Sequence, residues 1–197
     1  MKILNLYSGI GGNRQLWGDV DVTAVEYKED IAQVYKEFYP KDDVIVADAH
    51  EFLLHNFQWF DFIWSSPPCT SHGQYRYNVG VKAKGYKPLY PDMKLYEEIF
   101  LLKHHFSGKW VVENTISYYE PPIKPQKISR HYFWSNFIIP PIKLETTGIR
   151  YKNKIKDLED FLGINLSPYK LKEKRKILRN CTNPVLGLHV LNSAYNL

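Results

Sequence analysis

The sequence predicts an α/β fold built on a mostly parallel β-sheet. Short apolar runs rich in β-branched and aromatic residues alternate with longer segments whose apolar residues recur at helical spacing. Several of the runs are apolar throughout, which is typical of strands that helices cover on both faces. Acidic or glycine-rich stretches follow several runs directly. Because open α/β sheets bind ligands at the carboxyl ends of their strands, we expect a ligand site there.

Composition narrows the class of protein. A chain of 197 residues suits one domain with a sizeable core, and its two cysteines indicate free thiols in a reducing compartment. No apolar run approaches membrane-spanning length, so we expect a cytoplasmic protein without membrane contact. The net charge of +5 indicates a polyanionic partner, with a merely basic surface as the alternative. The basic character is local, because Lys143–Arg179 holds eleven Lys and Arg against five Asp and Glu.

The first strand is predicted over Lys2–Leu6, and a glycine-rich turn follows it at residues 7–12. Leu16 and Trp17 then suggest a brief helix. A glycine-rich turn between a strand and a helix lets the backbone approach a ligand closely. The third glycine of Gly-x-Gly-x-x-Gly is missing, which disfavours a dinucleotide site.

Two carboxylates follow the next two strands. The second strand, Val20–Val25, ends in Glu26, and the third, Val44–Ala47, leads to Asp48, with a helix over Lys28–Tyr39 between them. An acid at the tip of the second strand is placed to accept hydrogen bonds from ribose hydroxyls. The pair therefore indicates a nucleoside pocket, although a helix cap is an equal alternative for Asp48.

The fourth strand leads to the candidate nucleophile. It contains the apolar residues Phe60, Phe62, Ile63 and Trp64 and runs into Pro67 and Pro68, which lack amide protons and stop strand pairing. Cys69 follows, just beyond the carboxyl end of the strand. The position suits a nucleophile, whereas a lone cysteine is in general more often a buried structural residue.

The segment after Cys69 is a long loop to about Tyr90, in which Lys and Arg are interleaved with Tyr. Such loops offer phosphate contacts and stacking surfaces, so we expect a mobile lid that contacts nucleic acid. A helix capped by Asp92 should follow and end near Ser107 and Gly108. Its predicted buried face contains Met93, Tyr96, Ile99 and Phe100.

The remaining elements place a second acid beside the thiol. The fifth strand, Lys109–Val112, ends in Glu113 and Asn114, on the rim that carries Cys69. A polar turn and a strand are expected within 126–134, and two short helices around Ile155–Leu162 and Lys170–Leu178. A last helix begins at Pro184, with Asn183 as its cap. Cys181 is expected to be structural.

These motifs, taken in order, resemble those of the C5-cytosine DNA methyltransferase family. Residues 7–12 look like its Phe-x-Gly-x-Gly-Gly loop, with Tyr7 for Phe, and Pro67-Pro68-Cys69 like its Pro-Cys nucleophile. Glu113-Asn114-Thr115 looks like Glu-Asn-Val, and Asn183-Pro184 with Gly187 like the carboxy-terminal helix that returns to the cofactor. The chain is similar to a small, phage- or prokaryote-like member with a reduced target-recognition region.

The resemblance implies an S-adenosylmethionine-dependent methyltransferase fold, Rossmann-like, with a mostly parallel sheet and a small basic recognition insertion. It divides the chain into a catalytic and cofactor-binding part (1–142), a basic target-recognition segment (143–179) and a carboxy-terminal helix returning to the catalytic part (180–197). S-adenosylmethionine would be the cofactor, and no metal site is implied. The residues expected at the cofactor are Tyr7, Ser8, Gly9, Gly11, Gly12, Glu26, Tyr27, Asp48, Ala49, Pro67 and Asn183.

The resemblance also implies roles around the base. Cys69 would add to carbon 6 of a flipped cytosine, Glu113 would hold its N3 and amino edge, and Arg130 would lie at the O2 side. Arg130 is further expected to lower the pKa of Cys69. The remaining residues expected at the substrate are Pro68, Ser71, Arg76, Asn114 and Gln126.

Two departures from the family pattern shape the expected substrate. Gln126 is followed two and four residues later by Ile128 and Arg130, so only one arginine of Gln-x-Arg-x-Arg is kept. The small basic segment suits phosphate contacts with double-stranded DNA, which position a protein without specifying sequence. We therefore expect short or relaxed target specificity, or a homo-oligomer or accessory recognition subunit. Restriction protection, phage self-modification and regulation are all open roles.

Four other functions stay open at this point. Ser66-Pro67-Pro68 also resembles the Ser-Pro-Pro-aromatic motif of exocyclic-amine methyltransferases, with Cys69 in place of the aromatic residue. The same C5 chemistry could act on RNA or on a free cytosine nucleotide. An inactive nucleic-acid-binding subunit is a third possibility. A dinucleotide oxidoreductase is the weakest, for want of the third glycine.

Overall fold

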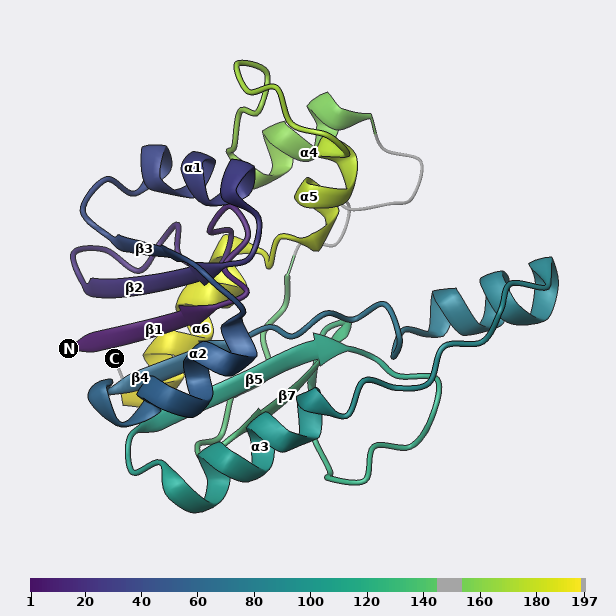
Figure 1. The fold of residues 1–197 in the computed structure, drawn as a ribbon, viewed down its shortest axis with the longest axis horizontal. Coiled ribbons are helices and arrows are strands. Elements are labelled where there is room, and N and C mark those ends of the chain that lie inside the picture. The colour runs from purple at the N-terminus through teal and green to yellow at the C-terminus, as the bar shows by residue number, and fades with distance from the viewer. Residues whose placement is uncertain (145–153, 196–197) are drawn as a thin grey trace.

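The computed structural model describes residues 1–144 and 154–195, which contain one seven-stranded sheet in the order β3-β2-β1-β4-β5-β7-β6 (Figure 1). β1 to β5 run parallel, and β7 is antiparallel to both of its neighbours. The predicted α/β fold with a mostly parallel sheet is confirmed. The strands are β1 Lys2–Leu6, β2 Asp21–Glu26, β3 Asp43–Val46, β4 Phe62–Ser65, β5 Lys109–Thr115, β6 Gln126–Ile128 and β7 His131–Ser135.

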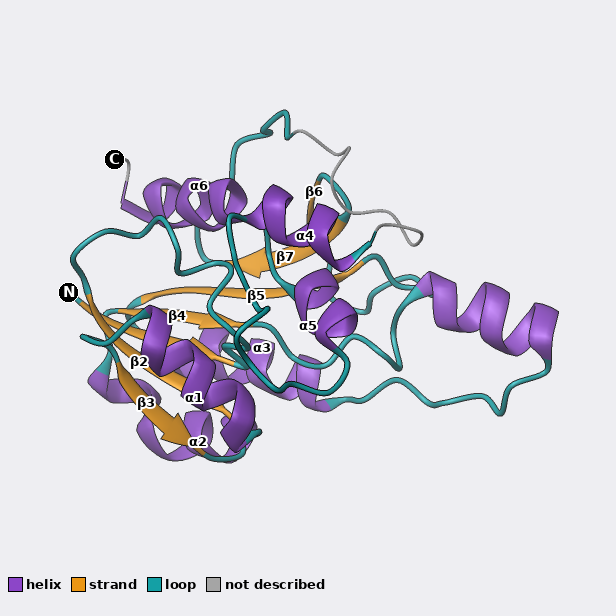
Figure 2. Ribbon diagram, turned by 90° about the horizontal axis from the view of Figure 1, so that it is seen from above, coloured by secondary structure: helices purple, strands orange, loops and turns teal. Residues whose placement is uncertain are grey.

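Helices cover both faces of the sheet because neighbouring residues in the central strands point to opposite sides. Ile3 and Phe62 pack with α6 on one face, whereas Leu4 and Ile63 pack with α2 and α3 on the other (Figure 2). A short 3₁₀ turn (Phe57–Trp59) and a π-helix (Arg76–Ala83) complete the elements. The helices are α1 Glu29–Phe38, α2 Ala49–Asn56, α3 Lys94–His105, α4 Ile155–Leu162, α5 Lys174–Asn180 and α6 Pro184–Tyr195.

A third apolar cluster joins the basic segment to the cofactor half. Ile10 and Ile31 pack with Leu158 of α4 and Leu178 of α5. The described part of the predicted recognition segment therefore lies on α1, beside the glycine-rich turn. Residues 145–153, which belong to the same predicted segment, lie outside the described residues.

Two segments within residues 11–56 differ from the predicted secondary structure. Residues 11–17 form successive turns instead of the predicted brief helix, with Arg14 N donating to Gly11 O and Trp17 N to Arg14 O. The guanidinium of Arg14 is bound by the buried Asp42 at 2.9 Å, and this contact competes with a continuous helix. The helix α2 was not predicted, although Asp48 caps it.

The buried face of α3 also differs from the expectation. Tyr96 and Ile99 are buried as predicted, but Met93 and Phe100 are each 53% exposed. Leu95, Glu98 and Leu102 complete the buried face. The buried carboxylate of Glu98 interrupts the apolar residues on this face, so the helical spacing of apolar residues does not mark the whole face in the sequence. The predicted second short helix begins at Lys174, four residues later than expected, because Glu173 before it has a left-handed φ of 57°. The long loop after Cys69 contains the π-helix.

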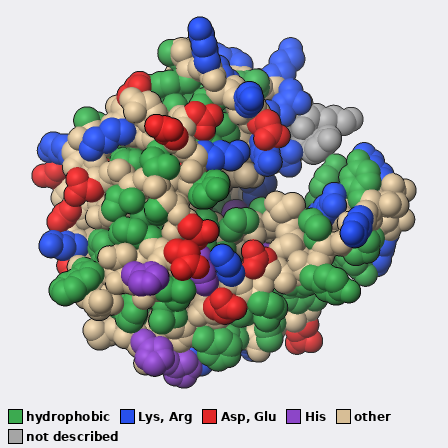
Figure 3. Space-filling model, viewed as in Figure 1, with side chains coloured by type: hydrophobic (Ala, Val, Ile, Leu, Met, Phe, Trp, Pro, Cys, Tyr) green, Lys and Arg blue, Asp and Glu red, His purple; other side chains and the backbone are tan. Residues whose placement is uncertain are grey.

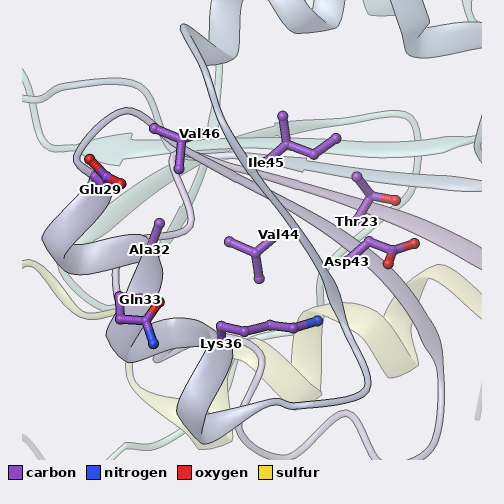
Figure 4. A pocket seen from close by; sticks show the side chains of 9 residues that line it. All are labelled: Thr23, Glu29, Ala32, Gln33, Lys36, Asp43, Val44, Ile45 and Val46. Carbon is purple, nitrogen blue, oxygen red and sulfur yellow. The ribbon is translucent and has the colours of Figure 1, made fainter.

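Two surface features complete the fold. Within residues 1–144 and 154–195, no helix is long and apolar enough to cross a bilayer. A pocket of about 520 Å³ opens between α1 and the edge strand β3, between Glu29, Lys36 and Val46 (Figure 4). It contains none of the residues expected at the site.

Candidate active site

A cavity of about 1020 Å³ opens at the carboxyl ends of β1, β2, β4 and β5. On the surface, Lys and Arg side chains gather over α4 and α5 and again on the projecting π-helix, and the surface between them is hollowed (Figure 3). The cavity collects most of the residues expected from the sequence. They are Tyr7, Ser8, Gly9, Gly12, Glu26, Tyr27, Asp48, Ala49, Pro67, Pro68, Cys69, Arg76, Glu113, Asn114 and Arg130.

The glycine-rich turn is held against β2. Ser8 N donates to Val25 O at 3.1 Å, and Gly9 N donates to Glu26 Oε2 at 3.0 Å. Gly9 has a φ of 55°, in the left-handed region that favours glycine, and Tyr7 adopts a similar φ of 54°. The turn thus exposes backbone to the cavity at the tip of β1.

The carboxy-terminal helix packs tightly on this turn. A Cβ added at Gly187 of α6 would lie 2.3 Å from Asn13 O, and one added at Gly12 would lie 2.7 Å from Thr182 O. Both approaches require glycine. Asn183 Oδ1 accepts from Val185 N and Leu186 N, so the predicted cap of α6 is confirmed. The last helix therefore returns to the glycine-rich turn.

The two strand-tip acids are fixed by backbone amides. Glu26 Oε1 accepts from Lys28 N at 3.0 Å, while its Oε2 holds Gly9. Asp48 caps α2, since its Oδ1 accepts from His50 N at 2.9 Å and from Glu51 N at 3.1 Å. The cap interpretation of Asp48 is thus confirmed, and the same residue also lines the cavity. Its Oδ2 has no hydrogen-bond partner in the described part of the chain.

A buried network beneath the glycine-rich turn was not foreseen. Glu98 of α3 is fully buried; its Oε1 accepts from the Tyr7 hydroxyl at 2.7 Å and lies 3.1 Å from His50 Nδ1. Its Oε2 accepts from the Ser65 hydroxyl at 2.5 Å. The hydrogen bond to Glu98 raises the pKa of His50. The only signal in the sequence was an acid within the apolar face of a helix.

The turn that carries the thiol is fixed from both sides. Asn114 Nδ2 on β5 donates to Pro67 O at 2.9 Å, which ties the turn to the neighbouring strand. The carbonyl of Cys69 accepts from His72 N and Gly73 N at 3.1 and 3.0 Å. Asn114 therefore lines the cavity with an amide already engaged in structure.

The thiol itself behaves differently from the expectation. Cys69 is open to the cavity, but the surrounding walls limit its hydration, and this desolvation, with the negative charge of Glu113, raises its pKa. The predicted lowering by Arg130 is wrong. The positive charge of Lys176 on α5 lowers the pKa of the thiol, but by less than desolvation and Glu113 raise it. Desolvation and the like charge of Arg179 lower the pKa of Arg130 itself.

Glu113 lies within β5 and is nearly buried, and its Oε1 is 2.5 Å from His131 Nδ1. His131 also lines the cavity. It was missed because nothing in the local sequence places it beside Glu113. Arg130 precedes it in the turn between β6 and β7, and interacts electrostatically with Glu113.

Four expected residues lie outside the cavity lining: Gly11, Ser71, Gln126 and Asn183. Gly11 has a φ of 79°, and its carbonyl accepts from the Tyr39 hydroxyl at 2.8 Å. The Ser71 hydroxyl accepts from Asp92 N at 3.0 Å. Both residues hold the chain near the cavity without facing it.

Gln126 braces the end of the sheet. Its Nε2 donates to Ser135 Oγ at 2.8 Å and to Phe137 O at 2.9 Å, while its Oε1 accepts from Ile139 N. Asn183 is engaged as the cap of α6. Gln126 and Asn183 therefore make hydrogen bonds that hold the fold together and do not face the cavity.

Basic residues that were not singled out complete one wall. Lys172, Lys176 and Arg179 line the cavity from α5 and the residues before it. Across from them stands the π-helix, where the guanidinium of Arg76 lies 5.1 Å from the Tyr86 ring centroid. Within residues 1–144 and 154–195, no group of three or more His, Cys, Asp or Glu side chains could hold a metal ion.

The root of the π-helix is attached by aromatic contacts. Tyr77 stacks on Tyr118 with ring centroids 4.1 Å apart and planes 11° from parallel. Lys82 Nζ lies 4.9 Å from the Tyr77 ring centroid. The helix therefore projects from the body while its first turn stays packed against the loop after β5 (Figure 1).

Solved structures that are similar to this chain include three methyltransferases. One is yhhF from Escherichia coli, described as a methyltransferase. It shares 14% sequence identity with this chain at a TM-score of 0.45, and the match covers 68% of this chain and 73% of yhhF. A second is described as a DNA modification methyltransferase encoded within a prophage of E. coli. It shares 15% sequence identity at a TM-score of 0.46, and the match covers 81% of this chain and 54% of that protein. The third is DNMT2 from Spodoptera frugiperda, which shares 25% sequence identity at a TM-score of 0.39. The match covers 58% of this chain and 35% of DNMT2.

No curated protein matches the chain. Residues 1–96, which include the glycine-rich turn, Glu26, Asp48 and Cys69, match the family model described as C-5 cytosine-specific DNA methylase. The resemblance inferred from the motifs is thereby confirmed. Residues 1–96, just under half of the chain, are thus similar to C-5 cytosine-specific DNA methylases.

Proposed function

We propose that this protein methylates carbon 5 of cytosine in DNA, with S-adenosylmethionine as methyl donor and a covalent bond between Cys69 and carbon 6 of the base. One observation carries the proposal. A single cavity holds a thiol and a nearly buried acid, Cys69 and Glu113, together with the two strand-tip acids Glu26 and Asp48. The arrangement supports a site for a base beside a site for a nucleoside.

The cofactor fits one half of the cavity. The Ser8 hydroxyl is buried and has no hydrogen-bond partner in the described part of the chain, so it can bind a polar group of a ligand. Glu26 and Asp48 would accept hydrogen bonds from ribose and adenine, and the 74% exposed ring of Tyr27 offers a stacking face. S-adenosylmethionine would supply an electrophilic methyl group there.

The base half explains why a thiol is needed. Carbon 5 of cytosine is a weak nucleophile, and addition of the Cys69 thiolate to carbon 6 moves the electron pair of the 5,6 double bond toward carbon 5 and N3. Glu113 would give a proton to N3 and so neutralise the developing charge. After methyl transfer, loss of the proton on carbon 5 and departure of the thiolate restore the aromatic base.

The nearly buried acid implies that the target base leaves its stack. Glu113 is nearly buried, so a base within a duplex reaches it only by being flipped out. The two basic flanks, on α5 and on the π-helix, are placed to contact the phosphates on either side of the cavity.

Nucleoside mass spectrometry of DNA from cells that express the protein tests the proposal. We expect 5-methylcytosine with the wild-type protein and none with Cys69→Ala. N4-methylcytosine would instead establish exocyclic-amine methylation. The absence of any modified base in DNA, with modification of RNA or free nucleotides, would contradict the choice of substrate.

Target specificity should be short or relaxed. Phosphate contacts from the basic flanks position the protein without reading sequence, and the described part of the recognition segment is two short helices. We expect methylation of a randomised duplex library at many contexts, read by bisulfite sequencing. A strict target longer than about four base pairs would contradict this expectation, because it requires several base-edge contacts.

A further inference from the structure

The contact between Glu113 and His131 is the most specific polar contact at the base end of the cavity. Nδ1 of His131 lies 2.5 Å from Oε1 of Glu113, and the two side chains are only 21% and 10% exposed. Glu113 Oε2 has no hydrogen-bond partner within residues 1–144 and 154–195. One carboxyl oxygen is therefore held and the other is left for a ligand.

The register of the sheet brings the two residues together. Glu113 of β5 is paired with Phe133 of β7, and Thr115 is paired with His131. His131 is therefore the diagonal neighbour of Glu113, on the same face of the antiparallel pair and within reach of a long side chain. The contact is fixed by two paired strands and not by a loop.

We propose that His131 is a positioning residue for Glu113 in cytosine methylation: Nδ1–H donates to Oε1 and leaves Oε2 to meet N3 of the base. The inference rests on the proposed function. When Cys69 adds to carbon 6, the proton on Oε2 passes to N3, and Glu113 becomes a carboxylate. A hydrogen bond to an ionised carboxylate is about twice as strong as one to a neutral group, so the bond from His131 strengthens during this step.

Arg130 and the Cys69 thiol both interact electrostatically with Glu113, and Arg179 acts in turn on Arg130. Arg130 interacts with Glu113 at longer range and approaches from the turn before β7. His131 is thus the residue that fixes which oxygen of Glu113 faces the base, while Arg130 acts on its charge.

Two variants of similar shape test the donor role of His131. Asn keeps an N–H donor close to the position of Nδ1, whereas Leu has nearly the same shape as Asn and no donor. We expect His131→Leu to lower kcat roughly 100-fold, in line with the loss of one such donor at other active sites, with little change in KM for DNA. We expect His131→Asn to stay within about tenfold of wild type.

The readouts are single-turnover methyl transfer and formation of a covalent adduct with DNA containing 5-fluorocytosine, where fluorine on carbon 5 blocks release of the thiolate. Equal activity of the Leu and Asn variants, both folded by circular dichroism, would overturn the inference. So would loss of activity in the Asn variant with unchanged cofactor binding. An inactive wild-type protein would count against the proposed function itself, and is distinguished in the same assay.

Discussion

Replacing Glu98 by Ala should lower the free energy of unfolding by about 3–5 kcal/mol, which corresponds to a fall in melting temperature of about 10 °C or more. The carboxylate is fully buried and binds three side chains, those of Tyr7, Ser65 and His50. Its removal leaves these groups without a partner in a region closed to solvent, and each such loss costs about 1–3 kcal/mol. Thermal and urea unfolding followed by circular dichroism measure the effect.

The same variant should weaken cofactor binding. Tyr7 has a φ of 54°, a conformation that non-glycine residues adopt only when their surroundings hold them there. The bond from its hydroxyl to Glu98 supplies such a restraint, at the start of the glycine-rich turn proposed to bind the cofactor. We expect the affinity for S-adenosylmethionine, measured by isothermal titration calorimetry below the melting temperature, to fall at least tenfold.

Glu97→Ala is the matched control. Glu97 is the preceding residue of the same helix, but its side chain is 61% exposed and lies 3.3 Å from Nε2 of the buried His50. Because this carboxylate stays hydrated, we expect its removal to cost about 0–1 kcal/mol. An equal decrease in the free energy of unfolding for the Glu97 and Glu98 variants would show that the hydrogen bonds of Glu98 do not stabilise the fold.

Local patterns allowed much of the sheet and of the cofactor half to be predicted. The strands β1 to β5 are apolar runs, and the acids at their tips follow in sequence, so a parallel sheet gathers them without further information. Cys69 is located by two prolines that end the strand before it. The roles proposed for these residues rest on the same positions.

The remaining contacts depend on register and packing between distant segments. His131 meets Glu113 through the pairing of β7 with β5, and Lys176 faces the cavity because α5 packs on α1. Glu98 broke the apolar pattern of α3, so Met93 and Phe100 were assigned to its buried face together with Tyr96 and Ile99, which are buried. The pKa of Cys69 was predicted in the wrong direction because desolvation by the cavity walls, which opposes the thiolate, has no signature in a local motif.

The pKa of Cys69 predicts a steep pH dependence for its reaction with iodoacetamide in the free protein. Since the thiolate is the reactive form and the raised pKa lies above the ordinary value of 9.0, the rate should increase about tenfold per pH unit from pH 7 to 9, or roughly 100-fold overall. Mass spectrometry of tryptic peptides assigns the site. Cys181 serves as an internal control, because burial raises its pKa to about 12 and should leave it nearly unreactive.

Lys176→Met should make the thiol less reactive still. Removing this cation, which lowers the pKa of Cys69, should reduce the alkylation rate at pH 8 about twofold to fivefold, as expected for a solvent-screened charge near the thiol. Lys174→Met, on the same helix but outside the cavity lining, should change the rate little. A rate that levels off below pH 8 would show that the free protein already holds a thiolate. The cationic wall would then control Cys69 more strongly than burial does, and covalent attack on the base would need no further activation of the thiol.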